Sequence, residues 1–353
     1  MIARRLRRPA ATLLALPAVL LALAGCTSSE ASPSTGGSAS STAGPGSDTL
    51  LPAAEGTTQY PLVLDTWAGQ TELAERPERV AVIGFSPNLD ALQALGATPV
   101  STMGEETAWP WRDQEWLASI ETVDTATRED PISFEAIAAS DPDLIVAVNY
   151  VADEADFARL ASIAPVLENA ERVKGDQISW QQTQRMVGEA LDLPAASERV
   201  ISDAEAAVAR TAAEHPELAG KTLTAATDYS DTGIAYYTVA GGTAERVVTQ
   251  LGFAPNPRAQ AFVDEPSVSD ERLGELDADV LVVFYLDDAV RRAREATPLF
   301  QGVPAVADGR YVSIATGEPG SELTWVMRRG ASALSLPWAV DVLADRASEV
   351  VSS

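Results

Sequence analysis

The strongest constraint on the fold is a pattern that occurs twice along the chain. Residues 132–146 (ISFEAIAASDPDLIV) and 268–282 (VSDERLGELDADVLV) each read as a short helix, an Asp-x-Asp turn and an apolar strand. Between them, residues 195–214 have high helix propensity, with apolar residues on one face. A helix of about 20 residues spans roughly 30 Å, the width of a small lobe. The pattern therefore predicts two pseudo-symmetric lobes joined by one long helix.

Helical and apolar strand segments alternate through both halves, which is typical of an α/β fold. Apolar runs such as residues 79–85, 141–148, 221–228 and 279–285 predict buried strands. We expect two Rossmann-like lobes joined by a single long backbone helix, with a ligand cleft between them. Ligands of open α/β sheets bind outside the carboxyl ends of the strands, so the loops after those ends are the expected site.

The first 26 residues predict export. Four arginines within residues 4–8 precede an apolar run, residues 10–24, which is short for a membrane-spanning helix and has the features of a signal peptide over residues 1–25. Leu23-Ala24-Gly25-Cys26 resembles a bacterial lipobox, and Cys26 is the only cysteine. We therefore expect lipid attachment at Cys26 and a location on the outer face of the cell membrane.

Composition sets the remaining boundaries. Residues 26–59 are rich in Ser, Gly and Thr and poor in large apolar residues, which predicts a disordered tether. The N-terminal lobe is expected over residues 60–194, the bridging helix over 195–215 and the C-terminal lobe over 216–353.

Charge and residue usage exclude several function classes. The chain has 25 basic and 51 acidic residues, a net charge of −26, which disfavours nucleic acid as a partner. His215 is the only histidine, so a site for bare zinc or manganese lacks its usual imidazoles. Nucleophilic catalysis lacks its usual base, and neither Gly-x-Ser-x-Gly nor Ser-x-x-Lys occurs, so we do not expect an enzyme. The duplicated α/β pattern disfavours a structural adhesin.

Several fragments occur in the order found in one known family. They are PERVAV (77–82), SFEAIAA (133–139) with PDLIV (142–146), LAGKT (218–222), TPLF (297–300) with VPAVADGRY (303–311), and SALSLPW (332–338). From about Thr66 onward the chain resembles the periplasmic binding proteins of ABC importers that carry ferric siderophores and, in relatives, cobalamin or haem.

The resemblance implies an ABC permease of the cell membrane as a partner. In such proteins each lobe presents a carboxylate to arginines of the permease, and by position Glu135 and Glu271 match these. A carboxylate near the start of a short helix is also stabilised by the helix dipole, which is the alternative explanation. The resemblance further implies a monomer without a cofactor of its own, which binds iron only as a siderophore chelate.

A ferric chelate is bulky, partly apolar and rimmed by oxygen, so aromatic faces and guanidinium groups suit it. Arg128 and Tyr150 lie near positions where a hydroxamate-binding relative has an arginine and a tyrosine, although the arginine's spacing differs by about one residue. Ordinary packing and solvated salt bridges are the alternatives for these residue types. The candidate ligand-binding residues are Trp109, Trp111, Arg112, Arg128, Tyr150, Tyr229, Phe262, Tyr285, Trp325, Arg328 and Arg329.

The net negative charge argues against a triply anionic catecholate, so we expect a hydroxamate or mixed-type ferric siderophore. Haem, held by a tyrosine ligand, and cobalamin remain the alternative cargoes.

Overall fold

The computed structural model describes residues 49–104, 108–124, 131–151, 153–172, 179–230 and 233–351 of the 353-residue chain. Two five-stranded sheets define a first and a second lobe, and a two-stranded hairpin, β1 (Leu62–Thr66) and β2 (Gly69–Leu73), adjoins the first. The predicted α/β class is confirmed. None of the helices in these ranges is both long and apolar enough to cross a bilayer.

The sheet of the first lobe is entirely parallel, in the order β5–β4–β3–β6–β7. Parallel neighbours need crossover connections, which the helices supply. Helices α1 and α5 contribute to the core on one face of the sheet, and α3 and α4 to the core on the other. The elements are β3 (Val80–Ile83), α1 (Ser86–Ala94), β4 (Ser101–Met103), α2 (Gln114–Ala118), β5 (Thr122–Asp124), α3 (Phe134–Ala139), β6 (Leu144–Val146), α4 (Glu154–Ala161), β7 (Val166–Leu167) and α5 (Trp180–Ala190).

The second lobe repeats this plan with one change. Its order is β10–β9–β8–β11–β12, in which β8, β11 and β12 are parallel but β9 and β10 run antiparallel to their neighbours. The elements are the 3₁₀ helix η1 (Pro216–Leu218), β8 (Leu223–Asp228), β9 (Ile234–Tyr236), α7 (Thr243–Gln250), η3 (Ala259–Phe262), β10 (Ser267–Val268), η4 (Asp270–Leu276), β11 (Val280–Tyr285), α8 (Asp288–Glu295), α9 (Pro298–Gln301), α10 (Pro304–Ala307), β12 (Tyr311–Ala315), α11 (Leu323–Arg329) and α12 (Ser335–Val351).

The duplicated sequence pattern has the same structural role in each lobe. Its strands, β6 and β11, each lie beside the first strand of their sheet. The second aspartate of each Asp-x-Asp turn fixes that neighbour: Asp143 accepts N–H groups of Glu78 and Arg79 at 2.7 and 3.0 Å, and Asp279 accepts that of Thr222 at 2.7 Å. The repeat therefore aligns two strands in each lobe.

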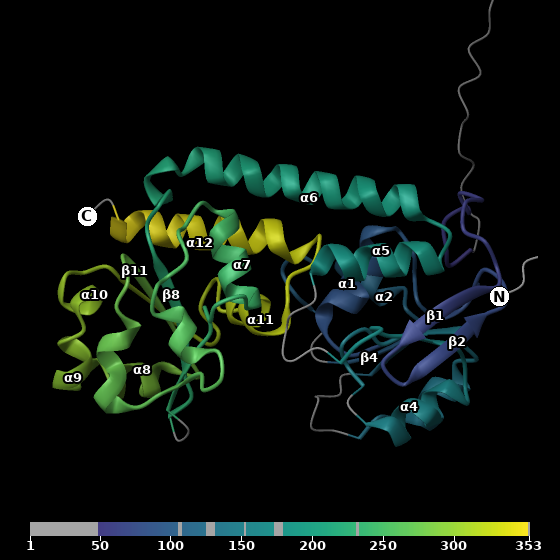
Figure 1. Cartoon of the computed structure of the whole chain (residues 1–353), viewed down its shortest axis with the longest axis horizontal. Coiled ribbons are helices and arrows are strands. Elements are labelled where there is room, and N and C mark those ends of the chain that lie inside the picture. Colours follow the sequence, from purple (N-terminus) through teal and green to yellow (C-terminus); the bar gives the residue numbers. More distant parts are fainter. Residues whose placement is uncertain are drawn as a thin grey trace, which may run out of the picture. The chain divides into compact units, whose positions relative to one another are not determined.

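The long helix is α6 (Pro194–Glu214), whose 21 residues span about 30 Å. It packs on α5 of the first lobe and on α12 of the second, and Figure 1 shows it running along both. Val200 packs against the cores of both lobes, whereas Ala204 and Val208 are buried in that of the second. The bridging helix is thus held by apolar contacts at both ends.

Residues 49–59, which the sequence analysis assigned to the tether, lie instead on the first lobe. The N–H groups of Gly56, Thr57 and Thr58 donate to the carboxylate of Asp192 at 2.7 to 2.9 Å. Leu51 is buried in the core of this lobe. The expected disorder is wrong for this segment, because a carboxylate more than 130 residues away satisfies its backbone.

Candidate functional site

A cleft of about 250 Å³ opens at the carboxyl ends of β8, β11 and β12. These strands are parallel, so their ends meet at one edge of the sheet, where the fold class predicts a ligand. The cleft is lined by Trp109 of the first lobe and, from the second, by Thr227, Tyr229, Phe284, Tyr285, Leu286, Ile314, Thr316, Gly317, Ser321, Glu322, Thr324, Trp325 and Arg328.

Helix α11 supplies the charged and aromatic wall of the cleft. Its buried residues, Leu323, Val326 and Met327, are at most 2% exposed and belong to the core of the second lobe. Residues three or four apart share a face of a helix, so Trp325 and Arg328 lie together on the other side. Both line the cleft. Packing of one face of α11 thus presents the other face to the cleft.

Four tryptophans form a row that crosses between the lobes. Trp325 of α11 lies 5.8 Å from Trp109, which stacks on Trp111 at 5.2 Å with an interplanar angle of 6°. Trp111 in turn lies 5.0 Å from Trp338 of α12. Offset-stacked and tilted rings at these separations attract one another. The row therefore joins the turn that carries Trp109 and Trp111 to two helices of the second lobe.

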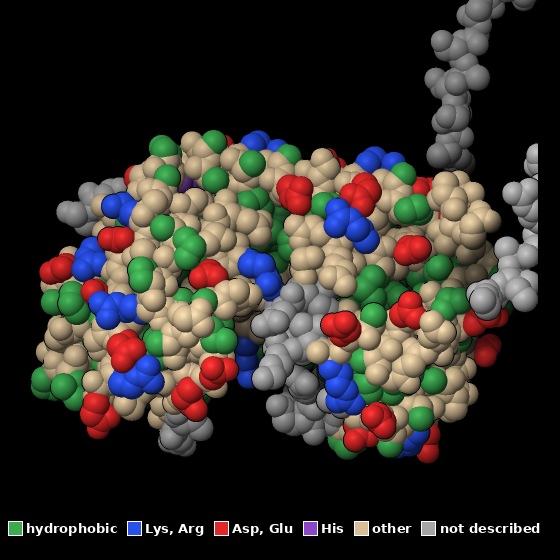
Figure 2. Space-filling view, in the orientation of Figure 1, with side chains coloured by type: hydrophobic (Ala, Val, Ile, Leu, Met, Phe, Trp, Pro, Cys, Tyr) green, Lys and Arg blue, Asp and Glu red, His purple; other side chains and the backbone are tan. Residues whose placement is uncertain are grey.

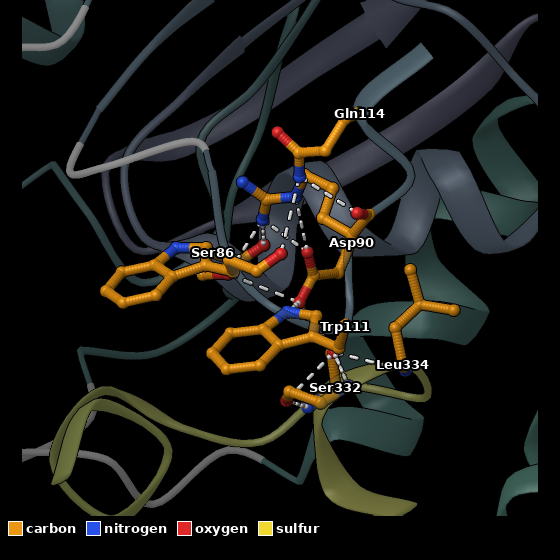
Figure 3. Close-up of polar contacts among 9 residues, drawn as sticks. Ser86, Asp90, Trp111, Gln114, Ser332 and Leu334 are labelled. Carbon is orange, nitrogen blue, oxygen red and sulfur yellow. Dashed lines mark hydrogen bonds and ion pairs between the residues drawn. The ribbon is translucent and has the colours of Figure 1, made fainter. Parts of the chain in front are cut away.

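A buried carboxylate, Asp90 of α1, fixes this row (Figure 3). It forms an ion pair with Arg112 in which both side chains are fully buried. Its Oδ2 accepts the indole N–H of Trp111 at 3.0 Å and the hydroxyl of Ser332 at 2.7 Å. Ser332 lies between α11 and α12, so the carboxylate also bonds to the second lobe. Ser86 adds a further hydroxyl contact, at 3.2 Å.

Arg112 was expected to bind ligand, and the structure gives it a different role. Its guanidinium donates to Asp90 and, at 2.8 Å, to the hydroxyl of Ser86, and the residue is 4% exposed. A buried guanidinium committed to a carboxylate stabilises the turn that carries Trp109 and Trp111.

Arg328 brings positive charge to the cleft. Its guanidinium lies 5.6 Å from the ring centre of Tyr229 and 5.7 Å from that of Trp325, within the range of cation–π attraction. The hydroxyl of Tyr229 is hydrogen-bonded to that of Tyr237. Burial, and next the neighbouring Tyr229, raise the pKa of Tyr237, so this phenol stays protonated at neutral pH. The pair holds Tyr229 at the edge of the cleft.

Arg329 lies on the first-lobe side of α11. Its guanidinium lies 4.7 Å from the ring centre of Phe85 and 5.9 Å from that of Trp325. It lines a second, much smaller cavity of about 10 Å³, together with Trp109 and Trp325. Arg329 thus belongs to the contact between the lobes.

Three of the predicted aromatic ligand residues are packed in the cores instead. Phe262 is 0% exposed and stacks on Tyr236 at 4.2 Å. Tyr285 is 1% exposed, its ring belongs to the core of the second lobe, and its hydroxyl lies 2.6 Å from that of Tyr311, although the residue also lines the cleft. Tyr150 packs edge-on against Phe85 at 5.4 Å. The structure thus places Phe262 and Tyr150 in the cores of their lobes and not in the lining of the cleft.

The hydroxyl and carboxylate groups of the cleft were not among the predicted ligand-binding residues. Thr316, Ser321, Glu322 and Thr324 follow β12 or begin α11 and line the cavity. Their position in the sequence after a predicted strand could have identified them as candidates. Such side chains supply hydrogen bonds rather than contact area, and Glu322 opposes the charge of Arg328.

The two predicted permease-contact residues are both exposed. Glu135 lies in the first turn of α3 and Glu271 in the first turn of η4, at matching positions of the duplicated unit. On the face shown in Figure 2, acidic and basic side chains are interspersed. Arg128 and Cys26 lie outside the described residues. In the part of the chain that the structure describes, no group of three His, Cys, Asp or Glu residues is arranged to hold a metal ion.

Comparison with known proteins identifies the fold. The model of a family described as periplasmic binding protein matches residues 82–316. Among solved structures, Streptococcus pneumoniae PiaA in complex with ferrichrome is 25% identical, with a TM-score of 0.68 over 82% of this chain and 98% of that one. A periplasmic solute binding protein from Mycobacterium smegmatis is 23% identical, with a TM-score of 0.65 over the same shares. Staphylococcus aureus SirA complexed with staphyloferrin B is 22% identical, with a TM-score of 0.63 over 81% and 98%. No curated protein sequence matches.

Proposed function

Because the chain belongs to the periplasmic binding protein family, we propose that it captures a ferric siderophore between its lobes and delivers it to the permease of an ABC importer. It is a binding protein rather than an enzyme. Iron enters only as the centre of the chelate, so the protein needs no cofactor of its own.

The observation that carries this proposal is the composition of the cleft. Aromatic faces of Trp109, Tyr229 and Trp325 offer contact area for an apolar chelate backbone, and Arg328 offers donors to oxygens at the iron centre. Hydroxyl groups of Thr316, Ser321 and Thr324 add further hydrogen bonds. A rigid, oxygen-rimmed chelate needs this mixture of flat apolar surface and scattered donors.

The charge balance of the cleft favours a hydroxamate or mixed-type chelate over a catecholate. Among the described residues that line the cleft, Arg328 is the one cation and Glu322 the one carboxylate. A triply anionic catecholate complex would need more than one compensating cation in a site partly shielded from water. A neutral or cationic ferric hydroxamate needs none. Ferrichrome, the ligand in the PiaA structure, is a ferric hydroxamate.

Export and anchoring complete the proposal. The signal peptide over residues 1–25 is removed, Cys26 carries lipid, and the residues that follow tether the lobes to the outer face of the cell membrane as a monomer. One face then contacts the permease through Glu135 and Glu271. Their exposure and matching positions in the two lobes support this role.

Charge reversal tests the permease contact. The double variant Glu135→Arg/Glu271→Arg should retain chelate affinity within about twofold, because neither residue lines the cleft, yet should abolish iron-limited growth on the chelate. Glu154→Arg is the matched control, since Glu154 is also exposed in the first turn of a helix of the first lobe. Wild-type growth of the double variant would refute the contact.

A fluorescence panel tests the ligand. Trp109 and Trp325 line the cleft, so bound ferric chelate should quench tryptophan emission of the protein lacking residues 1–26. We expect saturable quenching by ferrichrome and ferrioxamine B, and none by ferric enterobactin. Haem is the second candidate, favoured by Tyr229 at the cleft, because a tyrosine oxygen can ligate haem iron. If the protein shifts the Soret band of added haem and no ferric chelate quenches its tryptophan emission, haem replaces the siderophore as the proposed ligand.

A further inference from the structure

Trp109 separates two cavities. It lines both the main cleft of about 250 Å³ and the cavity of about 10 Å³ behind it, and Trp325 is the one other residue common to both linings. The smaller cavity extends to Ser86 of α1 and to Gly330. The larger one lies below the roughly 300–1,000 Å³ of ordinary small-molecule sites. The ring of Trp109 therefore limits the depth of a cleft that is already small.

Trp109 is held differently from its neighbour in the row. Trp111 donates its indole N–H to Asp90, so its ring is fixed by a polar bond. Trp109 is 3% exposed, and its buried indole N–H has no hydrogen-bond partner in the part of the chain that the structure describes. Its ring is positioned by contacts with Trp111 and Trp325. An apolar replacement at Trp109 consequently leaves no partner unsatisfied, whereas one at Trp111 would remove a hydrogen bond from the buried carboxylate of Asp90.

Hydrogen bonds that do not involve the indole ring hold the backbone at Trp109. The carbonyl of Trp109 accepts the N–H of Arg112 at 3.1 Å and a weaker contact from the side-chain amide of Gln114 at 3.4 Å. Arg112 is itself tied to Asp90. The turn can therefore keep its shape when the indole ring is removed.

We propose that Trp109 is a specificity-determining residue, whose ring closes the deep end of the cleft and restricts it to compact ferric chelates. The inference rests on the proposed function. Shortening the side chain joins the two cavities along Trp325 and admits chelates with a pendant group, while Phe keeps most of the wall. One extra or missing methylene group in an apolar pocket already changes selectivity by about 10- to 200-fold.

The test uses two ligands with the same iron centre: ferrioxamine B, and ferrioxamine B with a benzoyl group on its terminal amine. We expect wild type to prefer the unmodified chelate by about tenfold or more. Trp109→Ala should reduce that ratio at least fivefold, and Trp109→Phe should change it less than twofold. Affinity is measured by calorimetry, because quenching would itself change with a lost tryptophan.

Two control variants distinguish the effect of losing the Trp109 ring from a general packing defect. Trp338→Leu removes the far end of the same row, which lines neither cavity. Trp116→Leu removes a tryptophan of α2 whose indole N–H, like that of Trp109, has no hydrogen-bond partner among the described residues. Both should keep the wild-type ratio. An unchanged ratio in Trp109→Ala, or an equal change in Trp338→Leu, overturns the inference while leaving siderophore binding intact. Failure of wild type to bind any ferric chelate would remove the proposed function and the inference with it.

Discussion

The buried pair of Asp90 and Arg112 gives the sharpest prediction for stability. Both side chains are fully buried, and the carboxylate also accepts hydrogen bonds from Trp111 and Ser332. The substitution Asp90→Asn keeps the shape of the side chain but removes its charge, so the buried guanidinium of Arg112 loses its ion pair with Asp90. Breaking a buried ion pair by removing one partner costs about 3–5 kcal/mol. For a folded part of about 300 residues, each kcal/mol lowers the Tm by roughly 1.6 °C.

We therefore expect Asp90→Asn to lower the Tm by about 5–8 °C, measured by calorimetry or circular dichroism. Glu198→Gln is the control, because it makes the same acid-to-amide change in an ion pair with Arg185 whose side chains are 52% and 57% exposed. Exposed pairs contribute about 0–1 kcal/mol, so the control should stay within about 2 °C. Replacing both partners, as Asp90→Leu/Arg112→Met, should recover part of the loss. Equal Tm values for Asp90→Asn and wild type would refute the reasoning.

Two further predictions concern the N-terminal segment and the packed aromatics. Burial disfavours the ionised form of Asp192, but the N–H groups of Thr58, Thr57 and Gly56 outweigh it and lower its pKa below the ordinary 3.8. A depressed carboxyl pKa stabilises the fold above the unfolded value, and this stability is lost as pH falls through the folded one. Asp192→Asn should therefore lower the free energy of unfolding, measured by urea titration at pH 7. The difference in this free energy between variant and wild type should become smaller below pH 3.8. A difference that stays constant with pH would contradict this reasoning. Phe262→Ala should lower the free energy of unfolding by about 3–5 kcal/mol and change the chelate affinity less than twofold. A large loss of affinity in the folded variant would show that Phe262 binds the ligand.

The twin lobes and the long helix could be predicted because they depend on local pattern. Apolar runs of strand length mark β3, β6, β8 and β11, and the duplicated unit marks the equivalence of β6 and β11. The connections of the parallel strands follow from chain geometry. These features do not depend on which distant residues meet.

The site could be predicted only in part, because a loop aromatic does not reveal which way it points. Trp109, Tyr229, Trp325 and Arg328 line the cleft, but Trp325 and Arg328 do so from helix α11 and not from a loop directly after a strand. Tyr285 follows the alternation of Leu281 and Val283, which face the same core, so the period of the strand already pointed to packing.

Contacts between distant segments left no local signal. Arg112 looks like a ligand donor until Asp90 is found beside it. Residues 49–59 have the composition of a tether, but the carboxylate of Asp192 and the backbone at the start of α6 bind their C-terminal part. In both cases residues far away in the sequence decide the structure, and composition does not reveal such contacts.

Calorimetric titration of the protein lacking residues 1–26 with iron-loaded and iron-free ferrichrome tests the central claim most directly. We expect one chelate per chain for the iron-loaded form, with at least tenfold weaker binding of the iron-free form, which lacks the rigid oxygen-rimmed shape. Equal binding of both forms, or no heat with any ferric chelate, would contradict a siderophore site between the lobes.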